Sequence, residues 1–129
     1  EKMLEQARTK NIYTDLIHED INDFLKTKPN SFNLITAADV IPYYGDITEL
    51  FGNIKSALAT GGYFIFSVEA SVSADYSLGK NARFTHGKEY ILAVADKLNL
   101  SIIGTSELST RKEGSNEIEC NSFILEKTD

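Results

Sequence analysis

The stretch from Phe32 to Val68 constrains the fold most, because two apolar runs flank a clearly marked helix. Residues 32–37 and 63–68 are continuous runs of apolar, β-branched and aromatic side chains, which is typical of strands buried on both faces. Asp46 is suited to cap the start of the helix and Gly61 to end it. Its apolar residues recur at helical spacing: Ile47, Leu50, Phe51, Ile54 and Leu58. This unit predicts two parallel strands joined by a right-handed crossover.

Elements on both sides extend this unit into a larger α/β pattern. The sequence predicts helices over residues 1–10, 21–26 and 87–98, a short strand over residues 13–19, and a polar loop over residues 70–84. Residues 101–109 and 117–126 predict two strands joined by a turn, which makes an antiparallel hairpin. A length of 129 residues suits one domain. We therefore expect an α/β fold whose sheet is mostly parallel and ends in a hairpin.

Composition and charge exclude several classes of protein. The chain carries 13 basic and 19 acidic residues, a net charge of −6, with no basic block, so nucleic acid is not expected as a partner. No apolar run approaches the roughly 20 residues that a membrane-spanning helix needs. The single cysteine, Cys120, cannot form an internal disulfide, which fits a reducing compartment such as the cytoplasm. Two distant histidines and one cysteine lack the spacing of a metal site.

Four stretches of the sequence carry a family resemblance. They are residues 1–8 (EKMLEQAR), 18–21 (HEDI), 32–41 (FNLITAADVI) and 58–64 (LATGGYF). In this order they resemble the class I, Rossmann-like S-adenosylmethionine-dependent methyltransferases. Within that family, YYGD at residues 43–46 and RFTH at residues 83–86 are most similar to predicted methyltransferases associated with tetratricopeptide repeats. The resemblance implies a strand order 3-2-1-4-5-7-6, with residues 32–37 as strand 4 and the last strand inserted antiparallel.

The chain departs from this family in its glycines. Its eight glycines contain no G-x-G-x-x-G spacing, and Gly61-Gly62 precedes a strand instead of joining a strand to a helix. The glycine-rich cofactor loop of the family, and the acidic residue that ends its second strand, are not found. We expect residues 1–129 to form a single truncated methyltransferase domain without this loop. An open edge on the strand at residues 32–37 would follow, which favours self-association through that edge. Cofactor binding by this chain alone is expected to be weak or lost.

The resemblance implies S-adenosyl-L-methionine as the cofactor and assigns residues to it. The Asp20 carboxylate would accept a hydrogen bond from the adenine amino group, and the Ile21 backbone N–H would face the ring. The carbonyls of Ala37 and Ala38 would receive the methionine ammonium, and Asp39 would orient that ammonium or a substrate. Each residue has a plainer interpretation: Asp20 as a helix cap, the alanines as packing residues, and Asp39 as part of a solvated loop.

Two further residues are candidates for catalysis. By resemblance, Tyr43 lies in the loop beside the transferable methyl, where it would donate a hydrogen bond to a substrate or stack on it. His86 would act as a general base, although a histidine at a helix start often has a structural role. The sequence thus predicts methyl transfer to a small-molecule or protein acceptor by direct displacement, driven by proximity and orientation. The alternative is a non-catalytic α/β interaction module derived from a methyltransferase.

Overall fold

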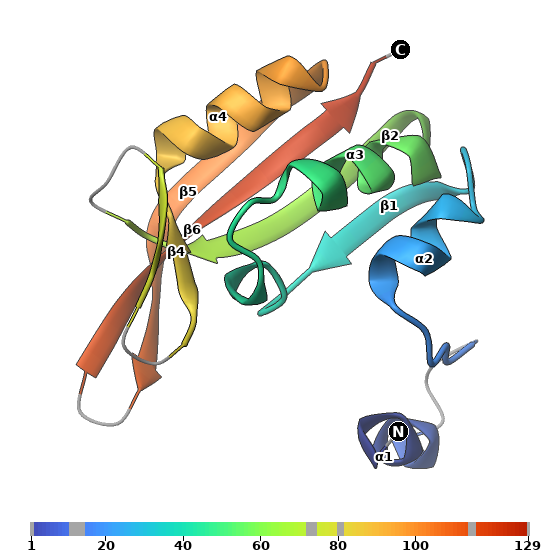
Figure 1. The fold of residues 1–129 in the computed structure, drawn as a ribbon, viewed down its shortest axis with the longest axis horizontal. Helices are drawn as coiled ribbons and strands as arrows, with labels where there is room; N and C mark the ends of the chain where they lie inside the picture. Colours follow the sequence, from blue (N-terminus) through green and yellow to red (C-terminus); the bar gives the residue numbers. More distant parts are fainter. Residues whose placement is uncertain (1, 11–14, 72–74, 80–81, 114–115, 129) are drawn as a thin grey trace.

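The structure is a computed structural model that describes residues 2–10, 15–71, 75–79, 82–113 and 116–128, with the side chains of residues 2, 107–113, 116 and 117 left out. The helical elements are α1 (Lys2–Lys10), α2 (Ile21–Lys26), the 3-10 turn η1 (Ile41–Tyr43), α3 (Thr48–Ala57) and α4 (Lys88–Lys97). The strands are β1 (Phe32–Ala37), β2 (Leu58–Glu69), β3 (Tyr76–Leu78), β4 (Phe84–His86), β5 (Leu100–Glu113) and β6 (Asn116–Lys127). Figure 1 shows their arrangement.

The main sheet has the strand order β1-β2-β6-β5. Strand β2 pairs in parallel with β1, in the register Ile35 opposite Phe64, and antiparallel with β6, in the register Phe66 opposite Phe123. Strands β5 and β6 form the antiparallel hairpin that the sequence predicts. The α/β fold is therefore confirmed, with a mixed sheet in which β6 is inserted antiparallel between β2 and β5. This order agrees with the 4-5-7-6 part of the order that the resemblance implies.

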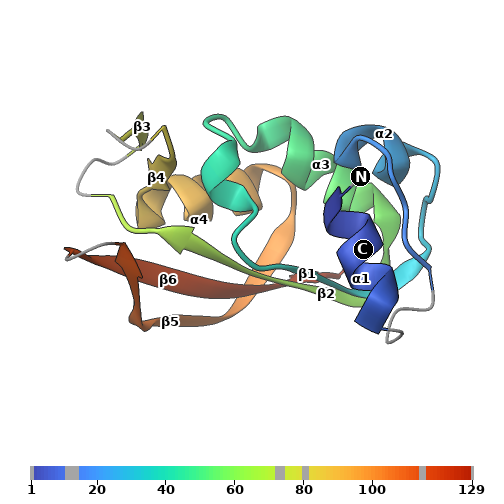
Figure 2. The ribbon, with the colours of Figure 1, turned by 90° about the horizontal axis from the view of Figure 1, so that it is seen from below.

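The hydrophobic core lies between the sheet and three helices. Helices α2, α3 and α4 all lie on one face of the sheet (Figure 2). Alternate residues of β2 point into this core, and the aromatic rings of Phe64 and Phe66 stack with their centroids 4.6 Å apart. Phe51 of α3 meets the Phe64 ring edge-on. This alternation along β2 is expected, because a strand covered by helices on one side buries every second side chain.

The opposite face of the sheet carries no helix among the described residues (Figure 2). Four large apolar side chains are exposed on these strands: Leu34, Tyr63, Ile65 and Ile103. Helix α1 stands away from the sheet in Figure 1, and its Met3 is exposed. Within the described residues β1 pairs only with β2, so its outer edge is an edge of the sheet. Self-association through that edge stays a prediction.

The structure corrects three sequence-based predictions. The strand predicted over residues 13–19 is wrong for residues 15–19, which pair with no strand of the main sheet. Residues 13 and 14 lie outside the described part. Helix α3 ends at Ala57, not at Gly61, because Leu58 already pairs with Phe32. The predicted loop at residues 70–84 contains β3 and the start of β4, which are too short to show a period.

Candidate functional site

The candidate site lies at the carboxyl ends of the two parallel strands. After Ala37 at the end of β1, the chain passes through Asp39 and enters η1. Strand β2 ends at Glu69, beside this turn. Ligands of open α/β sheets bind at the carboxyl ends of parallel strands, so these positions form the natural place for a binding site.

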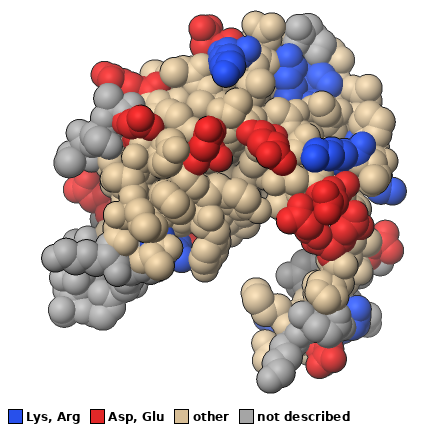
Figure 3. Space-filling model, in the orientation of Figure 1, with Lys and Arg blue, Asp and Glu red and all other residues tan. Residues whose placement is uncertain are grey.

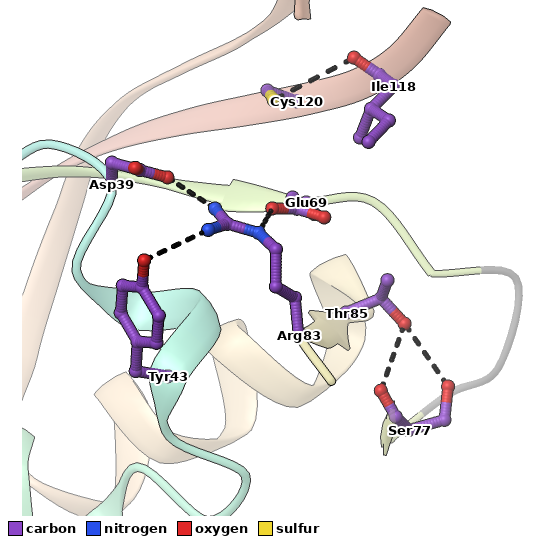
Figure 4. A network of polar contacts seen from close by, with 8 residues as sticks. All are labelled: Asp39, Tyr43, Glu69, Ser77, Arg83, Thr85, Ile118 and Cys120. Carbon is purple, nitrogen blue, oxygen red and sulfur yellow. Dashed lines mark hydrogen bonds and ion pairs between the residues drawn. The ribbon is translucent and has the colours of Figure 1, made fainter. Parts of the chain in front are cut away.

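One arginine joins the residues of this region. Arg83, in the loop before β4, donates from Nε to Glu69 Oε2 at 2.6 Å and from one terminal nitrogen to Tyr43 Oη at 3.2 Å. Its other terminal nitrogen donates to Asp39 Oδ1, which completes an ion pair (Figure 4). The guanidinium also lies over the Tyr43 ring, 5.2 Å from the ring centroid. We call these four residues the Arg83 cluster.

Burial and charge act in opposite directions on Arg83. Burial by itself would lower the pKa of Arg83, because desolvation disfavours the charged form. Hydrogen bonds and charges from Asp39 and Glu69 outweigh this effect and raise the pKa. The guanidinium therefore stays charged, and the Glu69 side chain, only 4% exposed, has its charge compensated.

A shallow groove of about 240 Å³ lies at the carboxyl end of β1 and includes Ala38, the residue before Asp39. Its lining is mostly small or apolar: Thr36, Ala37, Ala38, Ile65, Phe66, Ser67 and Ser122. Ligand pockets usually enclose about 300–1,000 Å³, so this groove has room for part of a cofactor-sized molecule. The structure thus places Ala37 and Ala38 in one groove, directly before Asp39.

Asp20 and Ile21 lie at the start of α2. The Asp20 carboxylate accepts a hydrogen bond from the Asp23 backbone N–H at 3.1 Å, so it caps this helix. The same carboxylate adds to burial, the larger cause, in raising the pKa of Tyr44. Asp20 therefore lies near the residue that follows η1. The Ile21 side chain packs against the core. Their predicted contacts with adenine stay predictions.

His86 is fully buried in an aromatic cluster. Its ring stacks on Tyr90 and tilts against Tyr76, and its Nε2 lies 3.1 Å from the Gly45 carbonyl oxygen. The Nε2–H tautomer donates this bond, which leaves buried Nδ1 without a hydrogen-bond partner. A Cβ at Gly45 would lie 2.8 Å from the Phe84 ring, so glycine is required there for this packing. These contacts give His86 a structural role, and its catalytic role stays a prediction.

The stability of the protein should fall as the pH falls below about 6.5, because burial lowers the pKa of His86 from that value. In this window the unfolded chain binds a proton that the folded chain does not, so acid favours unfolding. His86→Gln should reduce this slope, which urea unfolding above and below pH 6.5 would measure. The matched change His18→Gln should retain the contribution of His86. An unchanged slope in His86→Gln would contradict the prediction.

The structure brings Asp39 and Tyr43 together and adds two residues that sequence reasoning did not assign. Glu69 and Arg83 complete the cluster, whereas the His86 ring packs in the aromatic cluster, although its backbone bridges Ala70, the residue after Glu69. The sequence position of Glu69 could have indicated a site residue, since this charged residue directly follows the apolar run of residues 63–68. Asp39 follows β1 in the same way. Arg83 begins the RFTH stretch of the family resemblance, but it lies in an irregular segment and follows no predicted strand, so the sequence assigned it no role.

Other kinds of site receive no support from the described part of the chain. No group of histidine, cysteine and acidic residues there is arranged to hold a metal ion. None of the helices described is both long and apolar enough to cross a membrane. On the face that carries α2, α3 and α4, acidic and basic side chains are interspersed (Figure 3).

Known proteins share this fold. A methyltransferase from Leishmania major superposes on 98% of this chain with a TM-score of 0.75 and 16% identity, and 52% of that chain is covered. One from Mesorhizobium loti superposes on 98% with a TM-score of 0.71 and 18% identity, and 76% of it is covered. Phosphoethanolamine N-methyltransferase 2 from Haemonchus contortus, in complex with S-adenosyl-L-methionine, superposes on 79% with a TM-score of 0.59 and 18% identity, and 34% of it is covered.

The family is shown by sequence as well. No curated protein matches this chain. The chain spans only about half, 52%, of the Leishmania structure, although nearly all of it superposes. The family model described as "Methyltransferase domain" matches residues 1–66, which is more than half of the 129 residues. The chain therefore belongs to the methyltransferase domain family.

Proposed function

We propose that this chain supplies the acceptor-facing part of an S-adenosylmethionine-dependent methyltransferase. The observation that carries the proposal is the extent of the family match, which ends within β2. The match covers α2, β1 and η1, the elements that bear the residues predicted to hold the cofactor. Strand β1 runs into η1 at the carboxyl ends of β1 and β2, where a ligand would bind. Helix α2 contacts α3, and its Phe24 ring lies beside Phe32 at the start of β1.

The residues present fit one portion of the cofactor. The groove at Ala37 and Ala38 has small side chains that allow a ligand to approach the backbone closely, and Asp39 would pair with an ammonium group. Asp20 lies at the start of α2, where it would accept from the adenine amino group. When bound, S-adenosylmethionine supplies an electrophilic methyl group carried by a sulfonium. The complete protein would supply the remaining cofactor contacts, in keeping with the greater length of the related structures.

The acceptor is a small molecule or a protein whose nucleophile would lie beside Tyr43. Tyr43 is 63% exposed, and its hydroxyl, which accepts from Arg83, still has its own proton to donate to an acceptor. Holding the acceptor in line with the methyl group supplies most of the rate enhancement in such a displacement. His86 would serve as the base only if its buried ring reaches the acceptor. The tetratricopeptide-associated subgroup and a cytoplasmic location belong to the same proposal, supported by YYGD at residues 43–46 and by a single cysteine.

One observation favours the alternative, a non-catalytic interaction module. The helix-free face of the sheet exposes apolar side chains of the main-sheet strands, among them Leu34 and Ile65. Apolar surface of this kind often marks a contact with another protein segment. An interaction module would keep the fold and the open face, and it would have no affinity for the cofactor.

Calorimetric titration of the full-length protein with S-adenosylhomocysteine separates the two functions. We expect binding, and we expect Ala38→Leu to weaken it by about tenfold or more, because the larger side chain fills the groove. A tenfold loss of affinity corresponds to about 1.4 kcal/mol of binding free energy. The control Ala93→Leu adds the same atoms at an exposed position of α4 and should bind normally. Absence of binding by the unaltered full-length protein would favour the interaction module.

A further inference from the structure

We propose that Arg83 is a positioning residue of the methyltransferase site: anchored by buried Glu69, it holds Tyr43 and also Asp39, which directly follows the groove at Ala37 and Ala38. This inference rests on the proposed function and deepens it. It assigns a role to two residues, Arg83 and Glu69, that lie outside the family match to residues 1–66. It also links the residue predicted to contact the cofactor with the residue predicted to face the acceptor.

The bonding of Arg83 indicates a positioning role and not a ligand-binding one. Each of its three nitrogens donates to a different side chain: Glu69, Tyr43 and Asp39. The Arg83 side chain is only 13% exposed, so little of the guanidinium is accessible to a ligand. An arginine that binds an anionic ligand would direct a pair of donors outward. Here the planar fork is used within the protein (Figure 4).

Glu69 supplies a rigid anchor. It is the last residue of β2, and its backbone lies opposite Cys120 of β6. The bond from Arg83 Nε to the Glu69 carboxylate is short, 2.6 Å, and Glu69 is buried. Removal of one partner from a buried ion pair leaves an uncompensated charge, so the pair holds together strongly. Arg83 is thereby fixed to the sheet although it lies in a loop.

Asp39 and Tyr43 are exposed, and their contacts with Arg83 restrain them. Asp39 has a φ of +59°, a conformation that residues other than glycine adopt rarely unless their surroundings fix it. Its side chain is 59% exposed, so no packing fixes it. Tyr43 is similarly exposed, and it contacts Arg83 through both its hydroxyl and its ring. One side chain therefore restrains two positions of the segment between β1 and α3.

The test compares single and double variants of the full-length protein by calorimetric titration with S-adenosylhomocysteine. Arg83→Lys keeps the positive charge but replaces the planar fork with one ammonium, which cannot bond to three partners in the same geometry. Asp39→Asn keeps the side-chain shape and suits the positive φ. We expect each change to weaken binding by about tenfold, as loss of one charge-assisted contact would. The double variant should bind no more weakly than either single variant, because both changes remove the same interaction.

Two carboxylate variants control for charge and folding. Glu69→Gln should reproduce the loss caused by Arg83→Lys, since it removes the anchor. Glu49→Gln breaks an exposed ion pair with Lys26, at 4.0 Å, and should bind normally. Each titration is made well below the unfolding midpoint of the variant, so a residue with only a structural role would leave the affinity unchanged.

The possible results separate this inference from the function on which it rests. Normal binding by Arg83→Lys, or losses that add in the double variant, would overturn the positioning role and leave the proposed function in place. Failure of the unaltered protein to bind would overturn the proposed function, and this inference with it.

Discussion

Replacing Phe66 with alanine is expected to lower the free energy of unfolding by about 3–5 kcal/mol, the usual cost of deleting a buried aromatic side chain. Phe66 is 2% exposed. Its ring stacks on Phe64 and Phe123, with centroids 4.6 and 5.3 Å away, and meets Phe51 edge-on at 4.9 Å. The resulting cavity would lie where β2, β6 and α3 meet, so three elements would lose contacts at once. Urea unfolding followed by circular dichroism measures the change.

The control for this prediction is an exposed apolar residue. Leu78 is 62% exposed on β3, and Leu78→Ala should change the free energy of unfolding by less than about 0.5 kcal/mol. A loss at Phe66 as small as the loss at Leu78 would mean that the four aromatic rings do not form a close-packed core.

Gly62→Ala should destabilise the protein by about 1–3 kcal/mol or more, the range for overpacking a filled interior. A Cβ at Gly62 would lie 2.8 Å from the carbonyl oxygen of Ala59, 3.1 Å from that of Phe32 and 3.2 Å from that of Asn33. All three are backbone atoms, which cannot rotate away as a side chain can. The start of β2 would therefore have to move away from β1.

Gly52→Ala provides the matched change with the opposite sign. Gly52 lies inside α3, and beyond its chain neighbours and its own helix backbone a Cβ there would meet no atom within 4 Å. Because alanine favours a helix interior over glycine, this change should stabilise the protein by about 0.5–1 kcal/mol. The unfolding midpoints of the two variants should lie on opposite sides of the midpoint of the unaltered protein. Equal shifts would contradict the close approach of the three carbonyl oxygens to Gly62.

Periodicity in the sequence was sufficient to predict two elements of the fold at their observed bounds. The helix at residues 21–26 and the strand at residues 32–37 are confirmed at the predicted bounds, because each has a clear apolar pattern and a clear stop. The short strands β3 and β4 were missed, since three residues cannot show alternation. The strand predicted over residues 13–19 failed for the opposite reason. Its apolar pattern was adequate, but residues 15–19 have no partner strand in the described structure.

The candidate site was only partly predictable. Asp39 and Tyr43 could be proposed from the sequence because the family resemblance covers the stretch after β1. Their connection through Arg83 could not, since residues 39, 43, 69 and 83 are brought together by the crossover and by the loop before β4. The burial of His86 was also unpredictable, because its ring packs against Tyr76, which precedes it in the chain, and Tyr90, which follows it.

The insertion of β6 between β2 and β5 sets the order in which this sheet can assemble during synthesis. Among the described residues β5 joins the sheet only through β6, although it precedes β6 in the chain. From the time that Glu69 leaves the ribosome until Asn116 and the residues after it follow, the β6-facing edge of β2 has no partner. At about 5–20 residues per second this interval lasts a few seconds. A nascent chain of this protein therefore carries an unsatisfied strand edge that chaperones would need to shield from other chains.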